Sequence, residues 1–251
     1  MAVMDPGGAQ EAEGPADPYN VFYAEVAARQ LADWLPAAPT TVLDLSGGWG
    51  TFARLMTDAG HDVVRAVLNQ GPTTEAASTA GGRLHEVAAD TRDLRWLARD
   101  SVDVVLAESR SLSFSLLAEE SVENIARALR PGGRLLLCVD SLVLGLARLA
   151  EQGRWAELAD VPSADVVLVP YEDGTITRCF WPAELRQLLE DAGLKVEWVR
   201  PRTVLSKEAV VRALTTDPSA LPTLVQTEVA LSADREGESV GIHLLASAIR
   251  S

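Results

Sequence analysis

The chain has 251 residues, 47% of them apolar, and a formal charge of −14. This length suits one α/β domain with a sizeable core, and the apolar content excludes general disorder. Because acidic residues are spread along the chain and no basic patch interrupts them, we expect a small-molecule partner rather than nucleic acid or an anionic membrane.

The sequence contains neither an apolar run long enough to cross a bilayer nor a secretory signal, which predicts a cytoplasmic protein. Cys138 and Cys179 lie in apolar strand-like segments without metal-ligand spacing, so we expect buried thiols in a reducing compartment. Two lysines against many arginines and alanines are typical of a GC-rich bacterial genome.

The first segment, residues 1–17, is rich in Gly, Pro, Ala and acids and is expected to be a disordered tail. Residues 18–251 are expected to form a single domain, because no linker or internal repeat divides them. This domain begins with an amphipathic helix over 21–35, which Pro36 ends.

Strand-like and helix-like segments then alternate, which predicts a parallel, doubly wound sheet. Gly60 is expected to end the first helix of this part in a left-handed conformation, and Pro131-Gly132-Gly133 to end the second. The predicted strands cover 41–45, 62–68, 84–89, 102–107 and 134–139, and the predicted helices cover 51–59 and 121–129.

The remaining segments are less regular and include a mostly helical segment over 141–158 and a hairpin of strands at 165–169 and 175–180. A helix over 182–192, a strand over 194–199 and a last strand over 240–248 follow. Since ligands bind at the carboxyl ends of parallel strands, we expect segments 18–36, 141–181 and 200–239 to form a cap around an acceptor pocket.

The sharpest motif is a strand that ends in glycines and opens a helix, over residues 42–50. Bare backbone lets a ligand approach closely, and a helix N-terminus attracts a carboxylate or phosphate. The glycines alone leave the ligand open, because Gly48, Gly50 and Ala53 also satisfy the dinucleotide pattern of NAD or FAD proteins. The candidate binding residues here are Asp44, Ser46, Gly47, Gly48 and Gly50.

With Asp44 four residues before Gly48, the chain resembles class I S-adenosylmethionine-dependent methyltransferases, and later motifs follow in the same order. These are the segments 89–94, 102–107, 129–135, 184–189 and 192–196. The resemblance implies a Rossmann-like, mostly parallel seven-stranded sheet with an antiparallel last strand, and S-adenosylmethionine as cofactor. It implies that Asp44 anchors the turn and the methionine end, and that Asp90 and Thr91 meet the adenine. Glu108, Ser109 and Arg110 follow the fourth strand at the same edge.

Two departures from this family concern the cofactor site. Ser46 stands where the family usually has glycine, so the turn must accept a side chain. After the second strand the chain offers Leu68 and Asn69 where the family usually has an acid for the ribose hydroxyls. An amide lacks the carboxylate's charge, so we expect cofactor affinity to be about tenfold weaker.

A general base is needed only if the acceptor must lose a proton. His243 is the candidate, because the start of an antiparallel last strand lies on the cofactor side; His61 and His85 precede strands at the opposite edge. Tyr23, with Tyr19, is expected to close over the cofactor, as aromatic residues ahead of the first motif do in similar proteins. Weaker candidates for contacting the acceptor are Asp140, Tyr171 and Arg178.

Three functions remain open from the sequence. The first is methyl transfer to oxygen, nitrogen or carbon of a small molecule, by in-line displacement. The second keeps the fold without methyl transfer, for example in a cyclisation, and Leu68 motivates it. The third is a NAD(P)-dependent oxidoreductase. The sequence lacks a catalytic Tyr-x-x-x-Lys pair, which argues against this function.

Overall fold

The computed structural model describes residues 17–46, 50–67, 81–91, 94–108, 110–115, 117–164, 166–171 and 174–251. The first part of the chain contains α1 (Pro18–Trp34), β1 (Thr41–Asp44), α2 (Gly50–Asp58), β2 (Asp62–Val67), β3 (Leu84–Ala88), β4 (Val102–Ala107), α3 (Ala118–Ala128) and β5 (Leu129–Asp140). The second part contains α4 (Leu142–Glu151), α5 (Trp155–Asp160), β6 (Val167–Pro170), β7 (Ile176–Cys179), α6 (Pro182–Asp191), β8 (Leu194–Pro201), α7 (Lys207–Thr216), α8 (Leu221–Ala233) and β9 (His243–Arg250).

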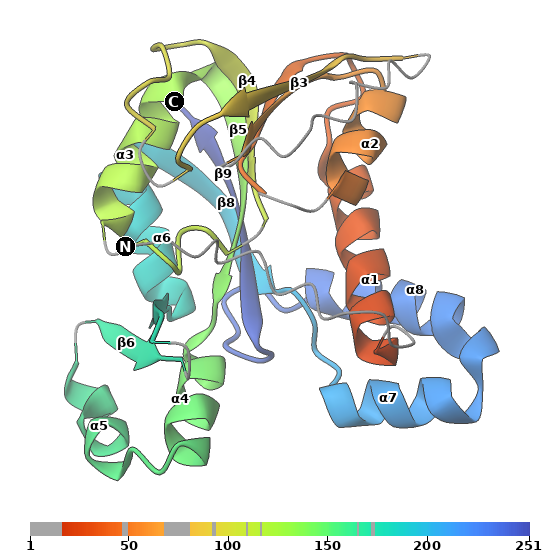
Figure 1. Cartoon of the computed structure of the whole chain (residues 1–251), viewed down its shortest axis with the longest axis vertical. Helices are drawn as coiled ribbons and strands as arrows, with labels where there is room; N and C mark the ends of the chain where they lie inside the picture. Colours follow the sequence, from red (N-terminus) through yellow and green to blue (C-terminus); the bar gives the residue numbers. More distant parts are fainter. Residues whose placement is uncertain are drawn as a thin grey trace.

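A seven-stranded sheet in the order β3-β2-β1-β4-β5-β9-β8 forms the centre of the molecule (Figure 1). Strands β1 to β5 pair in parallel, whereas β9 pairs antiparallel with both β5 and β8. The predicted fold class, a Rossmann-like sheet with an antiparallel last strand, is therefore confirmed. The antiparallel direction of β9 matters for function, because its first residue lies beside the last residue of β5.

Helices cover both faces of the sheet, since α3 and α6 pack on one face and α1 and α2 on the other (Figure 1). Side chains of β5 point alternately to the two faces of the sheet. Leu135 and Leu137 pack on the side of α3 and α6, and Leu136 and Cys138 pack on the side of α1 and α2. A strand stretch buried on both faces is expected to be apolar at successive positions, as Leu135 to Val139 of β5 are. Both cysteines are buried, as predicted.

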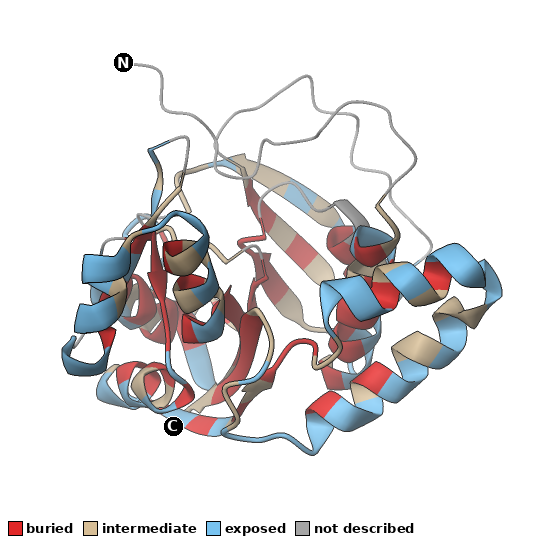
Figure 2. Cartoon of the chain, turned by 90° about the horizontal axis from the view of Figure 1, so that it is seen from below, coloured by how far each residue is buried: buried red, intermediate tan, exposed pale blue. Residues whose placement is uncertain are grey.

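Two lobes lie at the lower end of the sheet in Figure 1. Helices α7 and α8 pack with the start of α1 around residues such as Phe22, Val26 and Leu214. Helices α4 and α5 and the antiparallel pair β6–β7 form the other lobe around a separate apolar cluster that includes Leu149 and Val169. Figure 2 shows buried and exposed residues alternating along the lobe helices, as expected when one helix face packs.

The structure differs from the sequence prediction at two strand ends. Strand β5 begins at Leu129 rather than 134 and runs through the Pro-Gly-Gly segment, where a Cβ on Gly133 would lie 2.8 Å from the Arg130 carbonyl oxygen. Strand β9 begins at His243 rather than 240, because Gly241 turns the chain with φ +79° and passes against the Thr203 carbonyl. Helices α7 and α8 occupy a segment for which the sequence predicted only a cap.

The helix ends follow the expected chemistry. Gly60 has φ +93° and Gly193 has φ +82° after α2 and α6, the left-handed conformation that glycine adopts without strain. Helix α1 starts three residues earlier than predicted, because Pro18 occupies its first turn and Asp17 accepts a hydrogen bond from the Tyr19 N–H. Of the helices in the described ranges, none is long and apolar enough to cross a membrane.

Candidate functional site

The carboxyl ends of the parallel strands gather most of the predicted site residues that the structure describes. Asp44 ends β1, Asp90 and Thr91 follow β3, and Glu108 follows β4. Because β9 runs the other way, its first residue, His243, lies at the same edge and pairs in register with Asp140 of β5. The tertiary fold thus brings together residues that are far apart in the sequence.

Asp44 anchors the chain where β1 ends. Its buried carboxylate accepts a hydrogen bond from the Ser46 N–H at 2.8 Å and lies 3.3 Å from Arg65 Nε. Burial raises the pKa of Asp44, and the Ser46 N–H and Arg65 oppose that rise. This geometry supports the turn-anchoring role that the family resemblance implies.

Ser46 has a structural use for its side chain. The buried hydroxyl oxygen accepts a hydrogen bond from the Glu108 N–H at 3.2 Å, which ties the end of β1 to the end of β4. A glycine at this position would leave that N–H without this acceptor. The departure from the family pattern therefore stabilises the local backbone.

Several predicted cofactor residues lie outside the described residues. They are Gly47, Gly48, Leu68, Asn69 and Ser109. Gly50 begins α2, so a helix N-terminus does follow the glycine turn as predicted. The roles of these residues stay predictions.

Glu108 takes part in a buried ion pair with Arg202, which lies one residue beyond β8. Arg202 Nη1 also donates to Gln30 Oε1 of α1 at 2.8 Å. Burial disfavours the charge of Arg202, but Glu108 holds the pKa of the guanidinium above its ordinary value. The second carboxylate oxygen of Glu108, Oε1, is buried and has no hydrogen-bond partner in the described part of the chain.

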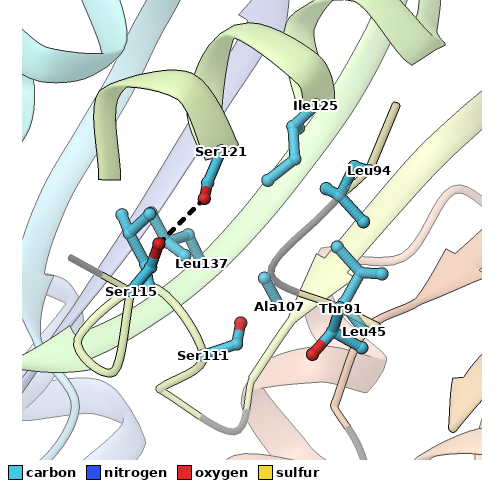
Figure 3. Close-up of a pocket in the computed structure, with 10 residues that line it drawn as sticks. Leu45, Thr91, Leu94, Ala107, Ser111, Ser115, Ser121, Ile125 and Leu137 are labelled. Carbon is cyan, nitrogen blue, oxygen red and sulfur yellow. Dashed lines mark hydrogen bonds between the residues drawn. The ribbon is translucent and has the colours of Figure 1, made fainter. Parts of the chain in front are cut away.

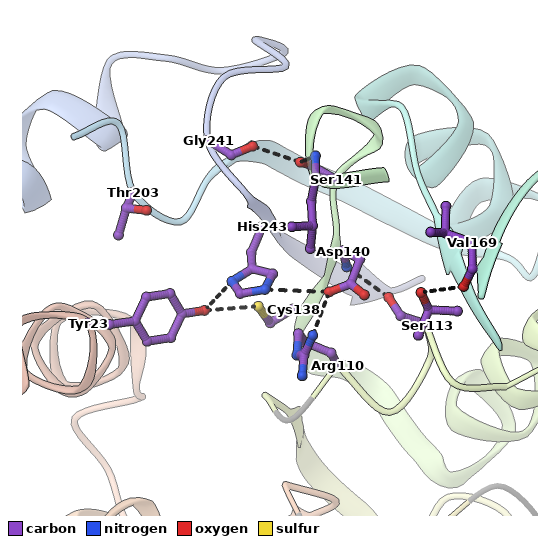
Figure 4. Close-up of polar contacts among 12 residues, drawn as sticks. Tyr23, Arg110, Ser113, Cys138, Asp140, Ser141, Val169, Thr203, Gly241 and His243 are labelled. Atoms are coloured by element: carbon purple, nitrogen blue, oxygen red, sulfur yellow. Dashed lines mark hydrogen bonds and ion pairs between the residues drawn. The ribbon is translucent and has the colours of Figure 1, made fainter. Parts of the chain in front are cut away.

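His243 lies at the centre of a buried polar chain (Figure 4). Its Nε2 is 3.4 Å from Asp140 Oδ1, and its Nδ1 is 2.8 Å from the Tyr23 hydroxyl. The carboxylate favours the proton on Nε2, so Nδ1 accepts the hydrogen bond that Tyr23 donates. Tyr23 also contacts Cys138 Sγ at 3.8 Å, and burial raises the pKa of that thiol to about 11.

The ionisation states in this chain follow from burial and charge. Burial lowers the pKa of His243 despite the adjacent Asp140, so the imidazole is neutral near pH 7. Burial raises the pKa of Tyr23 well above its ordinary value, so the phenol keeps its proton. Burial opposes ionisation of Asp140 too, but His243 and Arg110 hold its pKa below the usual value.

Thr91 lines a small cavity on the α3 side of the sheet (Figure 3). The cavity measures about 10 Å³, roughly the room of one water molecule. Leu45 and Ala107 also line it, so it lies beside the ends of β1 and β4. A predicted adenine-contacting residue is thus adjacent to a mostly apolar hollow.

The weaker candidates separate into two groups. Tyr171 lies near Asp140, with its hydroxyl 3.5 Å from Asp140 Oδ2, whereas Arg178 forms ion pairs with Glu119 and Glu184 at 2.7 and 2.9 Å. His61 precedes β2 and His85 lies near the start of β3, at the opposite edge, as predicted.

Two contributors to the site, Gln30 and Arg202, were not among the predicted residues, whereas Arg110 was predicted to lie at this edge but without a role. Arg110 follows β4 by three residues and donates to Asp140 Oδ1 at 3.0 Å. Its position just past a predicted strand was the one available signal. Gln30 lies on the buried face of α1, where the sequence gives no sign of its partner 172 residues away.

Part of this chain matches a known protein family. Residues 43–137 match the family model described as "Methyltransferase domain". The chain is similar to the demethylmenaquinone methyltransferase of Clavibacter sepedonicus, with 31% identity over 109 residues. This match covers 41% of the chain and 42% of that relative, so the chain spans less than half of the relative's length.

Solved structures share the fold. A putative S-adenosylmethionine-dependent methyltransferase from Listeria monocytogenes superposes with a TM-score of 0.60 at 16% identity, covering 91% of this chain and 99% of that one. The 1,6-didemethyltoxoflavin-N1-methyltransferase of Burkholderia thailandensis, with bound 1,6-didemethyltoxoflavin and S-adenosylhomocysteine, superposes with a TM-score of 0.53 at 16% identity, covering 96% of this chain and 93% of that one. At 16% sequence identity, these similarities show that the fold is shared and no more.

Proposed function

Because residues 43–137 match the family model described as "Methyltransferase domain", we propose that the protein transfers a methyl group from S-adenosylmethionine to a small molecule, as class I methyltransferases do. The observation that supports this most is the buried Tyr23–His243–Asp140 chain at the sheet edge that holds Asp44, Thr91 and Glu108. A base at this edge suits an acceptor that loses a proton, such as a hydroxyl or an activated carbon.

The described residues fit the proposed cofactor, S-adenosylmethionine. The buried Glu108 Oε1 lacks a partner in the described ranges, which favours a cationic or N–H-bearing group such as the methionine ammonium. Asp44 would hold the turn beneath the methionine end, and Asp90 and Thr91 would meet the adenine. When bound, the cofactor supplies an electrophilic methyl group, and the electron pair of the broken C–S bond returns to sulfur.

The protein's own contribution begins with positioning. Methyl transfer from a sulfonium is an in-line displacement, so alignment and exclusion of water supply much of the acceleration. The two lobes border the edge where the predicted residues gather, and α1 delivers Tyr23 to it. We propose that the lobes enclose the acceptor there.

Proton removal is the second contribution. The acceptor hydroxyl gives its proton to the Tyr23 oxygen as Tyr23 passes its own proton to His243 Nδ1. The resulting imidazolium is stabilised by Asp140, which lies against Nε2. Tyr23 keeps its phenol form before and after the step, in agreement with its raised pKa.

Calorimetric titration with S-adenosylhomocysteine tests the cofactor assignment. We expect a dissociation constant in the micromolar range, weakened about tenfold if Asn69 replaces the usual ribose acid. Absence of binding at millimolar ligand would refute the proposal. Binding without methylated product across hydroxyl, amine and carbon acceptors would instead favour the second function, a methyltransferase fold without methyl transfer.

The variant His243→Gln tests the base, with His85→Gln as the matched control. His85 is exposed at the opposite edge of the sheet. We expect His243→Gln to lower the methylation rate by about 10²–10⁴-fold while leaving S-adenosylhomocysteine affinity unchanged. Equal rates for the two variants would remove His243 from the mechanism.

A further inference from the structure

Arg110 extends the polar chain on the far side of Asp140. Its Nη1 donates to Asp140 Oδ1, the same oxygen that faces His243, and lies 3.4 Å from the Tyr171 hydroxyl. The Arg110 side chain is 27% exposed, whereas Asp140 is fully buried. Part of this side chain is therefore accessible, while the contacts of the guanidinium with Asp140 and Tyr171 hold it in place.

The backbone of Arg110 is held in an unusual conformation. Its φ is +60°, in the left-handed region that residues with a Cβ rarely adopt. Such strain persists where the surroundings impose it, and functional sites are where it concentrates. Here the strained residue is Arg110, whose guanidinium contacts Asp140, the carboxylate beside His243.

Arg148 of α4 adds a second cation nearby. Its guanidinium carbon lies 3.7 Å from the centre of the Tyr171 ring, and Tyr171 contacts both Arg110 and Asp140. Within the ranges that the structure describes, Arg148 forms no ion pair with a carboxylate. A half-buried guanidinium without a counter-ion is suited to bind an anion.

The charges in this cluster do not cancel. Arg110 and Arg148 carry two positive charges, Asp140 carries one negative charge, and His243 is neutral near pH 7. Glu108 and Arg202 neutralise each other nearby. Among the described residues of this cluster a net charge of about +1 remains, in a chain whose formal charge is −14.

We infer that the methyl acceptor is a small organic acid, whose carboxylate binds Arg110 and Arg148 while its ionisable group lies at Tyr23. This inference rests on the proposed methyl transfer. The planar guanidinium fork matches a carboxylate with two parallel hydrogen bonds. Only Asp140 and His243 lie between the anion site at Arg110 and the proton-accepting Tyr23. The carboxylate and the ionisable group of the substrate therefore belong on one small molecule, such as a hydroxy acid.

The experiment uses the whole protein saturated with S-adenosylhomocysteine and three matched pairs of probes. The acids are 3-hydroxybenzoate, 4-hydroxybenzoate and 4-hydroxyphenylacetate, and each is paired with its neutral primary amide. Calorimetry gives the dissociation constant of each probe for the wild type, Arg148→Gln and Arg154→Gln. Arg154 lies in the same lobe and pairs with Glu157, so its variant matches the change in charge and keeps the site intact.

We expect at least one acid to bind the wild type about tenfold or more tightly than its amide, because charge-assisted hydrogen bonds favour the carboxylate. Arg148→Gln should remove most of this preference and leave the amide unchanged, whereas Arg154→Gln should keep it. An acid preference absent from all three pairs, or equally reduced in both variants, overturns the inference. Because S-adenosylhomocysteine binding is measured first, failure of the proposed function would appear separately.

Discussion

Asp140 is the residue on which the site depends most. Its carboxylate lies between a neutral imidazole and a guanidinium, and the Ser113 hydroxyl accepts a hydrogen bond from its backbone N–H at 2.8 Å. Burial of such a carboxylate is tolerable only because charged and polar partners surround it. Because these partners keep Asp140 ionised, its carboxylate holds the proton of His243 on Nε2.

The proposed methyl transfer has a pH dependence that follows from this arrangement. Burial lowers the pKa of His243 below 6.5, so activity should fall only as the pH drops through that lowered value. Asp140 opposes the shift, so Asp140→Asn should lower the pKa of His243 further and move the acidic limb of kcat/KM to lower pH. The plateau rate should also fall, because the tautomer is no longer held. A limb that moves to higher pH contradicts this assignment.

Ser46 offers a test of the local backbone. Ser46→Ala leaves the Glu108 N–H buried without its acceptor, which should reduce the free energy of unfolding by about 1–3 kcal/mol. Urea denaturation measures the change, with the exposed Ser163→Ala as control. An unchanged midpoint for Ser46→Ala would show that this hydrogen bond contributes nothing to stability.

At the scale of elements, the direction of β9 determines what the site contains. A parallel last strand would present its end rather than its start at the cofactor edge, and His243 would lie elsewhere. The preceding segment is held by Gly241, which lies against Thr203 and whose carbonyl accepts a hydrogen bond from Ser141 at 2.7 Å. The β8–β9 connection and β5 are thereby joined at the site.

Helix α8 is attached to the same region by a buried carboxylate. Glu228 accepts hydrogen bonds from the Val204 and Leu205 N–H groups at 2.6 and 2.9 Å, one on each oxygen. Glu228→Gln turns one acceptor into a donor, so we expect a loss of about 1–3 kcal/mol and faster amide hydrogen exchange in α7 and α8.

The control for this prediction is Glu25→Gln, on the exposed face of α1. It removes the same charge without removing a buried acceptor, so it should change stability by less than about 0.5 kcal/mol. If exchange in α7 and α8 is as slow in Glu228→Gln as in Glu25→Gln, the carboxylate does not hold the lobe.

At the scale of the whole molecule, the Glu108–Arg202 pair connects the first half of the sheet to the end of β8, and Gln30 extends the connection to α1. Its two charges lie 94 residues apart in the sequence and are almost completely buried. Each charge therefore depends on the other for its stability.

Breaking this pair should be costly and strongly non-additive. Arg202→Met leaves a buried, uncompensated carboxylate, and we expect a loss of about 3–5 kcal/mol in the free energy of unfolding. The double variant Glu108→Met/Arg202→Met should lose clearly less than the sum of the single losses. Chemical denaturation of all four proteins gives the coupling energy, and additive losses would contradict a direct interaction.

The sequence alone determined most of the architecture. The apolar runs at 41–45, 62–68 and 102–107, with glycine turns between helix and strand, depend on local periodicity, which a single sequence displays. The same local patterns led to the family resemblance, and residues 43–137 match the family model described as "Methyltransferase domain". Local patterns were misleading at Pro131-Gly132-Gly133, because β5 already pairs with β4 at Leu129, before this segment, and the register shifts before pairing resumes at Arg134.

The composition of the site was decided only by the tertiary structure. His243 was named from the sequence, but its partners Tyr23 and Asp140 acquire their roles through contacts across the sheet, the first spanning 220 residues. No local pattern encodes such contacts, because they depend on strand order and on the direction of β9. Burial then sets which groups are charged, and burial is a property of the packed molecule rather than of the chain.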